Sequence, residues 1–187
     1  MDYRSLGHSG CAVSALGLGS MTFGAETDEP GAHEQLDHFV EAGGTLVDTA
    51  DVYGDGMSEE IIGRWLASRP AGATEPVVLA TKGRFPLDDS PNGAGLSARH
   101  LTRALDASLR RLGVEAVDLY QVHAFDPWTP LEETLRSWLS QQVPAGSSSG
   151  LGPDHPRHAR RPAPSRQGRL AAARGISRRC ASASPPG

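Results

Sequence analysis

Short apolar runs alternate with longer stretches of helical periodicity over residues 1–140 of the chain. The apolar runs that predict strands are 13–18, 46–47, 77–81 and 117–122. Each run is followed by a stretch whose apolar residues recur three or four positions apart, which is the spacing of one helix face. Nearly continuous apolar strands that alternate with helices predict a parallel sheet covered by those helices.

The helices expected after these strands have recognisable ends. The first spans 30–42, with a proline at its first position and two glycines after its end. The second begins at a Ser58 cap, with Glu59 in its positively polarised first turn. The third spans 98–112, and the fourth opens at Thr129 with a capping-box pattern. The expected buried faces are Leu36, Phe39 and Val40, then Ile61, Ile62, Trp65 and Leu66, then Leu101, Leu105, Leu109 and Leu112.

Two layouts of such units compete. A doubly wound nucleotide-binding sheet normally has a G-x-G-x-x-G turn after its first strand, but Thr22 stands here where the third glycine belongs. A barrel of β/α units instead places its reactive groups at the C-terminal ends of several strands. Asp48, Lys82 and His123 lie at such ends. We therefore expect an α/β fold in which residues 1–140 form the N-terminal half, about four units, of a (β/α)8 barrel.

Charge divides the chain into two unlike parts. Residues 1–140 hold 10 Lys and Arg against 21 Asp and Glu, whereas residues 141–187 hold 8 Arg against the single acid Asp154. Pro, Gly and Ser supply 20 of these last 47 residues, and large aliphatic side chains are scarce there. Such a segment buries too little apolar surface to offset the entropy lost on ordering. We therefore expect a disordered tail over 141–187.

The cysteines and the apolar runs exclude two classes of protein. Cys11 and Cys180 fall one in each part, which argues against a disulfide framework and for a reducing cytoplasm. No apolar run approaches the roughly 20 residues that cross a bilayer, so no membrane attachment is expected. His155 and His158 have loose metal-ligand spacing but no accompanying ligands, so no metal site is expected.

Four side chains of different chemistry lie at or near the predicted strand ends. Lys82, the only lysine among 18 basic residues, follows the third strand, and Asp48 follows the second. Tyr53 lies five residues further along the same loop, and His123 closes the fourth strand. Taken singly, each could serve a structural purpose, such as anchoring a loop. Their joint position at the ends of successive strands favours a shared site.

This combination suits the reduction of a carbonyl group. A phenol ordinarily has a pKa of about 10, and a nearby ammonium favours its ionised form and so eases release of its proton. Lys82 would supply that charge beside Tyr53, while Asp48 would keep the ammonium charged and oriented. His123 would hydrogen-bond the carbonyl oxygen and orient it. The set contains no hydride, so it requires a reduced nicotinamide.

The motifs around these residues resemble the aldo-keto reductase family. They are the segments 17–24, 48–54 with 58–60, 80–82, and 118–123 with 126–127 and 129–135. The resemblance covers residues 1 to about 139 and implies an oxidoreductase that reduces a small aldehyde or ketone. It implies that Tyr53 is the general acid, that Lys82 and Asp48 tune it, and that His123 orients the carbonyl.

The resemblance also implies a cofactor, NADPH, whose nicotinamide side contacts Ser20, Met21 and Asp48. A complete barrel takes about 250 residues and eight strands. The later strands and loops of the family, which hold the nicotinamide amide, the pyrophosphate and the 2′-phosphate, find no counterpart after about residue 139. We therefore expect most of the cofactor affinity, and with it the activity, to be impaired.

Other interpretations stay open on the sequence alone. The chain could be a catalytically silent fragment, or a scaffold that retains the site without the cofactor. It could also be a binding module whose basic tail contacts nucleic acid or an acidic partner, although that tail lacks interleaved aromatic residues. The abrupt change of composition near residue 140 suggests a tail translated out of frame. Unpaired edges on the first and fourth strands predict self-association.

Overall fold

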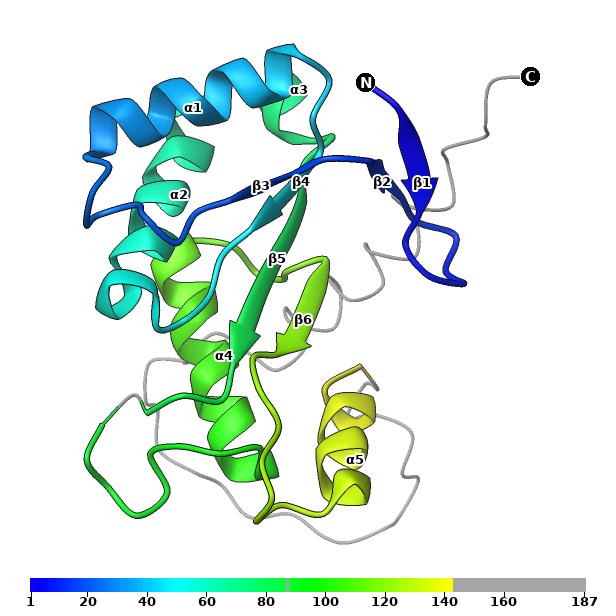
Figure 1. The fold of residues 1–187 in the computed structure, drawn as a ribbon, viewed down its shortest axis with the longest axis vertical. Coiled ribbons are helices and arrows are strands. Elements are labelled where there is room, and N and C mark those ends of the chain that lie inside the picture. Colours follow the sequence, from blue (N-terminus) through cyan, green and yellow to red (C-terminus); the bar gives the residue numbers. More distant parts are fainter. Residues whose placement is uncertain (87, 143–187) are drawn as a thin grey trace, which may run out of the picture.

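Four parallel strands form the centre of the structure, which is a computed structural model that describes residues 1–86 and 88–142. The strands are β3 (Gly17–Gly19), β4 (Leu46–Asp48), β5 (Val78–Gly83) and β6 (Leu119–Val122), paired in the order β3-β4-β5-β6. Because all four run in the same direction, their C-terminal ends meet at one end of the sheet (Figure 1). The expected parallel α/β sheet is confirmed.

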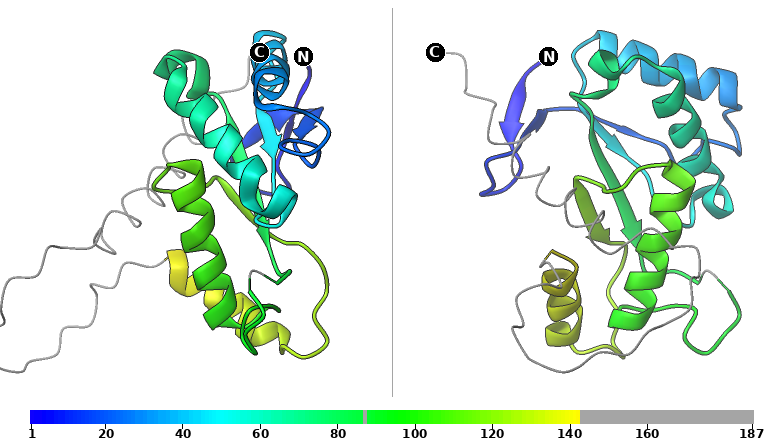
Figure 2. Two further views of the ribbon diagram at one scale, coloured as in Figure 1. Left: turned by 90° about the vertical axis from the view of Figure 1, so that its left-hand side faces the viewer. Right: turned by 180° about the vertical axis from the view of Figure 1, so that it is seen from behind.

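A helix follows each parallel strand, so the predicted alternation is confirmed as well. The helices are α1 (Glu29–Glu41), η1 (Tyr53–Gly56), α2 (Met57–Ser68), α3 (Ala71–Thr74), α4 (Ala98–Leu112) and α5 (Leu131–Gln142). Helices α1, α2 and α4 lie on one side of the sheet (Figures 1 and 2). The sheet and these helices therefore form two layers.

The core lies between those two layers and uses the apolar faces that the sequence predicts. Leu36 of α1, Trp65 of α2 and Leu112 of α4 are buried in one cluster with Val47 and Leu79 of the sheet. Complete burial of one such aliphatic side chain contributes about 1.5–3 kcal/mol. This contact holds the helices against the strands that carry the reactive groups.

Helix α4 has the bounds that its sequence predicts, because both of its ends are specified locally. The side chain of Ser97 accepts a hydrogen bond from the backbone N–H of His100, and Gly113 ends the helix with φ of 67°. A left-handed residue at this position is typical of glycine, which has no Cβ to clash.

The expected strand 13–18 is wrong in one respect, because it is two strands in two different sheets. Its first part is β2 (Ala12–Ser14), which pairs antiparallel with β1 (Tyr3–Ser5), and its second part is β3. The backbone N–H of Ser14 donates to the hydroxyl of Thr45, just before β4. The hairpin β1–β2 therefore packs where the parallel strands begin, and apolar periodicity alone does not reveal this change of partner.

Ser58 is not the cap of α2, contrary to the sequence prediction. Helix α2 is preceded by Gly56 in the left-handed region, and Ser58 lies inside its first turn with no exposed surface. The Ser58 hydroxyl donates to Ser20 and pairs with the Thr49 hydroxyl at 3.0 Å. A buried hydroxyl requires partners, and these partners join the loops after β3 and β4 to the start of α2.

Glu59 lies in the first turn of α2, as the sequence predicts, and its side chain is 0% exposed. Its carboxylate accepts hydrogen bonds from the Thr81 hydroxyl at 2.6 Å and from Arg111 Nε at 2.7 Å. Gly63 allows α2 to approach α4 this closely, since a Cβ there would lie 2.5 Å from the carbonyl oxygen of Arg111. The ion pair thus joins α2, β5 and the end of α4.

The expectation of a disordered tail over 141–187 concerns residues that, from 143 onward, lie outside the described part of the chain. Within residues 1–86 and 88–142, none of the helices has the length and apolar character that a membrane span needs.

We expect Glu59→Gln to lower the free energy of unfolding by roughly 3 kcal/mol, because it leaves a mostly buried guanidinium without its counter-charge. Urea unfolding followed by circular dichroism measures this loss. The matched control is Glu60→Gln in the same helical turn, whose exposed carboxylate lies 3.6 Å from Arg64. That change should cost less than about 1 kcal/mol, and equal losses in the two variants would contradict the role of the buried pair.

Candidate active site

Lys82 is the centre of the site, and all three of its ammonium protons have acceptors. β5 carries the side chain, which is 13% exposed. Its Nζ donates to Asp48 Oδ2 at 2.7 Å, to the carbonyl oxygen of Thr49 at 2.9 Å and to the Tyr53 hydroxyl at 3.1 Å. A mostly buried ammonium is stable only with such compensation. The sequence placed Lys82 after its strand, whereas the structure places it within β5.

Asp48 is the last residue of β4 and binds two different donors with its two carboxylate oxygens. Oδ2 accepts from Lys82, and Oδ1 accepts from Gln121 Nε2 at 2.8 Å. Gln121 lies on β6 and is paired with Lys82 in the sheet register. Gln121 is not among the site residues that the sequence predicts. The signal that could have found it is its position two residues before His123, because alternate residues of a strand face the same side.

Tyr53 reaches Lys82 from the loop between β4 and α2. Lys82 Nζ lies 4.7 Å from the centroid of the Tyr53 ring. Two backbone hydrogen bonds shape the loop: Tyr53 N–H donates to Ala50, and Asp51 N–H donates to the carbonyl oxygen of Lys82 at 3.1 Å. The loop is therefore bonded to the strand that carries the ammonium.

His123 follows β6 and completes the group. Its ring makes edge contacts with Tyr53, at 5.5 Å between centroids, and with Phe85, at 4.8 Å. Burial lowers the pKa of His123 below its ordinary value of 6.5, and the positive charge of Lys82 lowers it further against the opposing effect of Asp48. The imidazole is consequently neutral at pH 7. Its Nδ1 atom is buried and has no hydrogen-bond partner within the described residues.

Ser20 and Met21, the predicted cofactor contacts, differ in exposure. Ser20 is fully buried, and both its backbone N–H and its hydroxyl donate to the carbonyl oxygen of Asp48, at 3.0 and 3.1 Å. Met21 is 66% exposed at the start of the loop after β3. Met21 is therefore exposed to solvent, while the hydrogen bonds of Ser20 hold the loop against β4.

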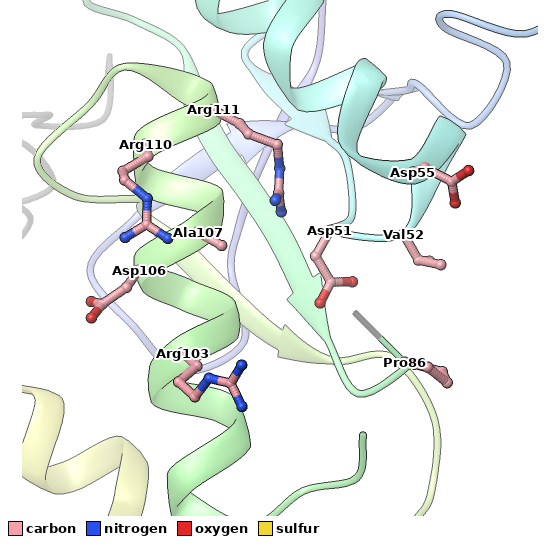
Figure 3. A pocket seen from close by; sticks show the side chains of 9 residues that line it. All are labelled: Asp51, Val52, Asp55, Pro86, Arg103, Asp106, Ala107, Arg110 and Arg111. Atoms are coloured by element: carbon pink, nitrogen blue, oxygen red, sulfur yellow. The ribbon is translucent and has the colours of Figure 1, made fainter. Parts of the chain in front are cut away.

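A cavity of about 470 Å³ lies beside this group, between α4 and the loop after β4 (Figure 3). Its wall includes Asp51, Asp55, Arg103, Arg110 and Arg111, and none of the four reactive side chains lines it. Asp51 is 1% exposed, and neither of its carboxyl oxygens has a hydrogen-bond partner among the residues described. Burial, followed by the negative charge of Glu59, raises the pKa of Asp51 to about 7, against weaker opposing effects of Arg111 and Lys82.

The structure thus brings four of the six predicted site residues into one group and places Ser20 and Met21 on the neighbouring loop. The group offers a phenol hydrogen-bonded to an ammonium, a carboxylate that orients the ammonium, and a neutral imidazole. Such an arrangement can donate a proton and stabilise the resulting phenolate. In the described part of the chain, no group of three or more His, Cys, Asp or Glu side chains is arranged to hold a metal ion.

Comparison with known proteins identifies the family. The model of the Aldo/keto reductase family matches residues 15–147, so the chain belongs to this family. The oxidoreductase YrpG of Bacillus subtilis, itself uncharacterized, is 39% identical over 160 residues, covering 81% of this chain and 48% of the relative. The aldo-keto reductase yakc [NADP(+)] of Schizosaccharomyces pombe is 35% identical over 156 residues, covering 80% of this chain and 44% of that protein.

A solved structure shows the same fold. The aldo-keto reductase AKR11C1 from Bacillus halodurans, in its holo form, superposes with a TM-score of 0.64 at 35% identity, over 76% of this chain and 46% of that chain. The predicted relation to a (β/α)8 barrel is therefore confirmed for the part that matches. The chain spans about half the length of the curated relatives it matches.

We expect Asp51→Asn to stabilise the protein at pH 8 by up to about 4 kcal/mol and to change little near pH 4. The folded-state pKa of Asp51 is raised from 3.8 to about 7, so the folded protein retains a proton that the unfolded chain releases between these values. The stability that this proton confers is complete below pH 3.8 and is lost as the pH rises to about 7. Urea unfolding at several pH values measures the difference.

The control for this prediction is Asp55→Asn, which changes an exposed aspartate in the same loop. Asp55 has φ of 54°, a conformation that asparagine also tolerates, so the substitution introduces no new backbone strain. Its effect on stability should be small, because the Asp55 side chain is exposed. A gain in Asp51→Asn that is the same at pH 4 and pH 8 would show that ionisation of Asp51 is not its cause.

Proposed function

We propose that this chain reduces a small aldehyde or ketone to an alcohol with NADPH, through the group formed by Asp48, Tyr53, Lys82 and His123. The observation that carries the proposal is the hydrogen bond of 3.1 Å between Lys82 Nζ and the Tyr53 hydroxyl. Membership of the aldo-keto reductase family supports it. Because the chain spans about half the length of its relatives, the activity of the whole protein is part of the proposal.

Tyr53 is the proton donor in this proposal. Its hydroxyl gives a proton to the carbonyl oxygen of the substrate, and the phenolate that forms lies next to the ammonium of Lys82. Two unit charges 4 Å apart attract each other by about 4 kcal/mol at the effective dielectric constant of a protein surface. Lys82 therefore favours proton transfer, and Asp48, which accepts a hydrogen bond from the Lys82 ammonium at 2.7 Å, supplies its counter-charge.

His123 orients the substrate in this proposal. A neutral imidazole has one N–H donor, which can hydrogen-bond the carbonyl oxygen without competing with Tyr53 as an acid. The lowered pKa of His123 supports this role, since it keeps the ring neutral at pH 7. Edge contacts with Tyr53 and Phe85 hold the ring beside the proton donor.

The described residues fit the nicotinamide end of the cofactor. Met21 is exposed on the loop after β3, Asp48 is 33% exposed at the end of β4, and the Ser20 hydrogen bonds hold that loop against β4. We propose that these residues line the nicotinamide. NADPH, when bound, supplies a hydride to the carbonyl carbon. The choice of NADPH is supported by the fission-yeast relative, whose name specifies NADP(+).

Titration of the full chain with NADPH, followed by nicotinamide fluorescence, and consumption of NADPH with a panel of small aldehydes test this proposal. Saturable binding with turnover supports a reductase. Saturable binding without turnover would instead favour the silent scaffold considered from the sequence. The absence of both binding and turnover would contradict the proposal.

We expect Tyr53→Phe to lower kcat at least 100-fold, the smaller end of what a general acid contributes, while the affinity for NADPH stays unchanged. The reason is that phenylalanine keeps the ring but removes the proton. Steady-state kinetics and the fluorescence titration measure the two quantities. Tyr3→Phe is the matched control, because the Tyr3 hydroxyl donates to Gly43, and Tyr3 lies on β1, whose hairpin packs where the parallel strands begin rather than where they end. Equal activity of Tyr53→Phe and Tyr3→Phe would exclude Tyr53 as the acid.

A further inference from the structure

We propose that Gln121 is a positioning residue of this site: its side-chain amide holds one oxygen of Asp48, so that the ammonium of Lys82 keeps a proton directed at Tyr53. The inference rests on the proposed function for its catalytic consequence. Its geometric part can be tested without turnover.

The strands themselves bring the three side chains into one row. Asp48, Lys82 and Gln121 come from β4, β5 and β6, which are neighbours in the sheet (Figure 1). Lys82 and Gln121 are direct partners in the parallel register. Gln121 therefore reaches Asp48 across the strand of Lys82, and its side chain contacts neither Tyr53 nor His123 through any recorded hydrogen bond or ring contact within the described residues.

Counting donors and acceptors shows why this contact has a direction. An ionised carboxylate only accepts hydrogen bonds, so the Gln121 amide must present its NH₂ group to Asp48 Oδ1, 2.8 Å away. Asp48 Oδ2 is then left for Lys82, at 2.7 Å. The other two protons of Lys82 reach the Thr49 carbonyl and the Tyr53 hydroxyl. Each of these donated protons has its own acceptor, so Lys82 and Gln121 do not compete for the same oxygen of Asp48.

Loss of the amide would introduce competition. Asp48 Oδ1 would lack its donor, and the ammonium of Lys82 is the cation already bonded to the other oxygen of the same carboxylate. If the Lys82 ammonium bonded to both oxygens of Asp48, it would use a second proton for this contact. That proton would no longer reach Thr49 or Tyr53. Gln121 thus acts on Tyr53 through Asp48 and Lys82, which a side chain that only fills space could not do.

The only lysine of the chain makes this effect measurable in the full-length protein. Selective ¹⁵N-lysine labelling gives a single side-chain ammonium signal, whose hydrogen exchange NMR can follow. We expect Gln121→Leu to change the exchange rate roughly fivefold, because one proton of the Lys82 ammonium changes its acceptor from Thr49 or Tyr53 to Asp48 Oδ1. Gln35→Leu, at an exposed position of α1, is the matched control and should leave the exchange unchanged.

Gln121→Glu separates positioning from packing, because it keeps the size of the side chain but replaces the donor by a second carboxylate. It should draw the ammonium toward itself, so that exchange at Lys82 becomes slower while kcat falls. For Gln121→Leu, kcat should fall roughly tenfold with little change in KM, since only proton donation is affected. Should the leucine variant fail to fold, the glutamate variant decides the question alone.

The exchange readout also separates this inference from the proposed function. If the wild-type chain does not turn over, the proposed function fails, but the ammonium exchange still reports on Gln121. Exchange in Gln121→Leu and Gln121→Glu that equals the wild-type rate would overturn the positioning role. Altered exchange with unchanged kcat in an active enzyme would overturn its catalytic consequence.

Discussion

The compensation of one mostly buried ammonium is the constraint on which the site depends. Lys82 lies between β4 and β6, and it keeps its charge through oxygen atoms of Asp48, Thr49 and Tyr53. These acceptors come from the end of one strand and the loop that follows it. Removing a charge from water is costly unless the partners are placed accurately. The register of the parallel sheet and the conformation of this loop are therefore prerequisites of the chemistry.

A second buried charge, the carboxylate of Glu59, helps to position that loop. Glu59 joins the start of α2 to Thr81 on β5 and to Arg111 at the end of α4. Ser58, the preceding residue, bonds to the loops after β3 and β4. The segment that carries Tyr53 thus lies between two anchored elements, β4 and α2. The contacts of α2 with β5 and α4 therefore help to fix the position of the Tyr53 hydroxyl beside the Lys82 ammonium.

The sequence was most informative where local chemistry determines local structure. The bounds of α4 follow from Ser97 and Gly113, whose capping preferences depend on neighbouring residues alone. The sequence was least informative where the partner is distant. Residues 13–18 form one apolar run, yet they pair with two different sheets. Serine is a residue type that favours the N-cap position, but the hydroxyl of Ser58 is buried against Ser20, which is 38 residues away in the sequence.

The sequence by itself determined the alternation of strands and helices and the presence of Asp48, Lys82 and His123 at strand ends, because apolar periodicity and strand direction are local properties. Only the tertiary structure decided that Gln121 bonds to Asp48, 73 residues away, and that Glu59 is buried and paired with Arg111. Hydrogen bonds and ion pairs depend on distances of about 3 Å between side chains. Sheet register and helix packing set those distances, and the residue types alone do not determine either of them.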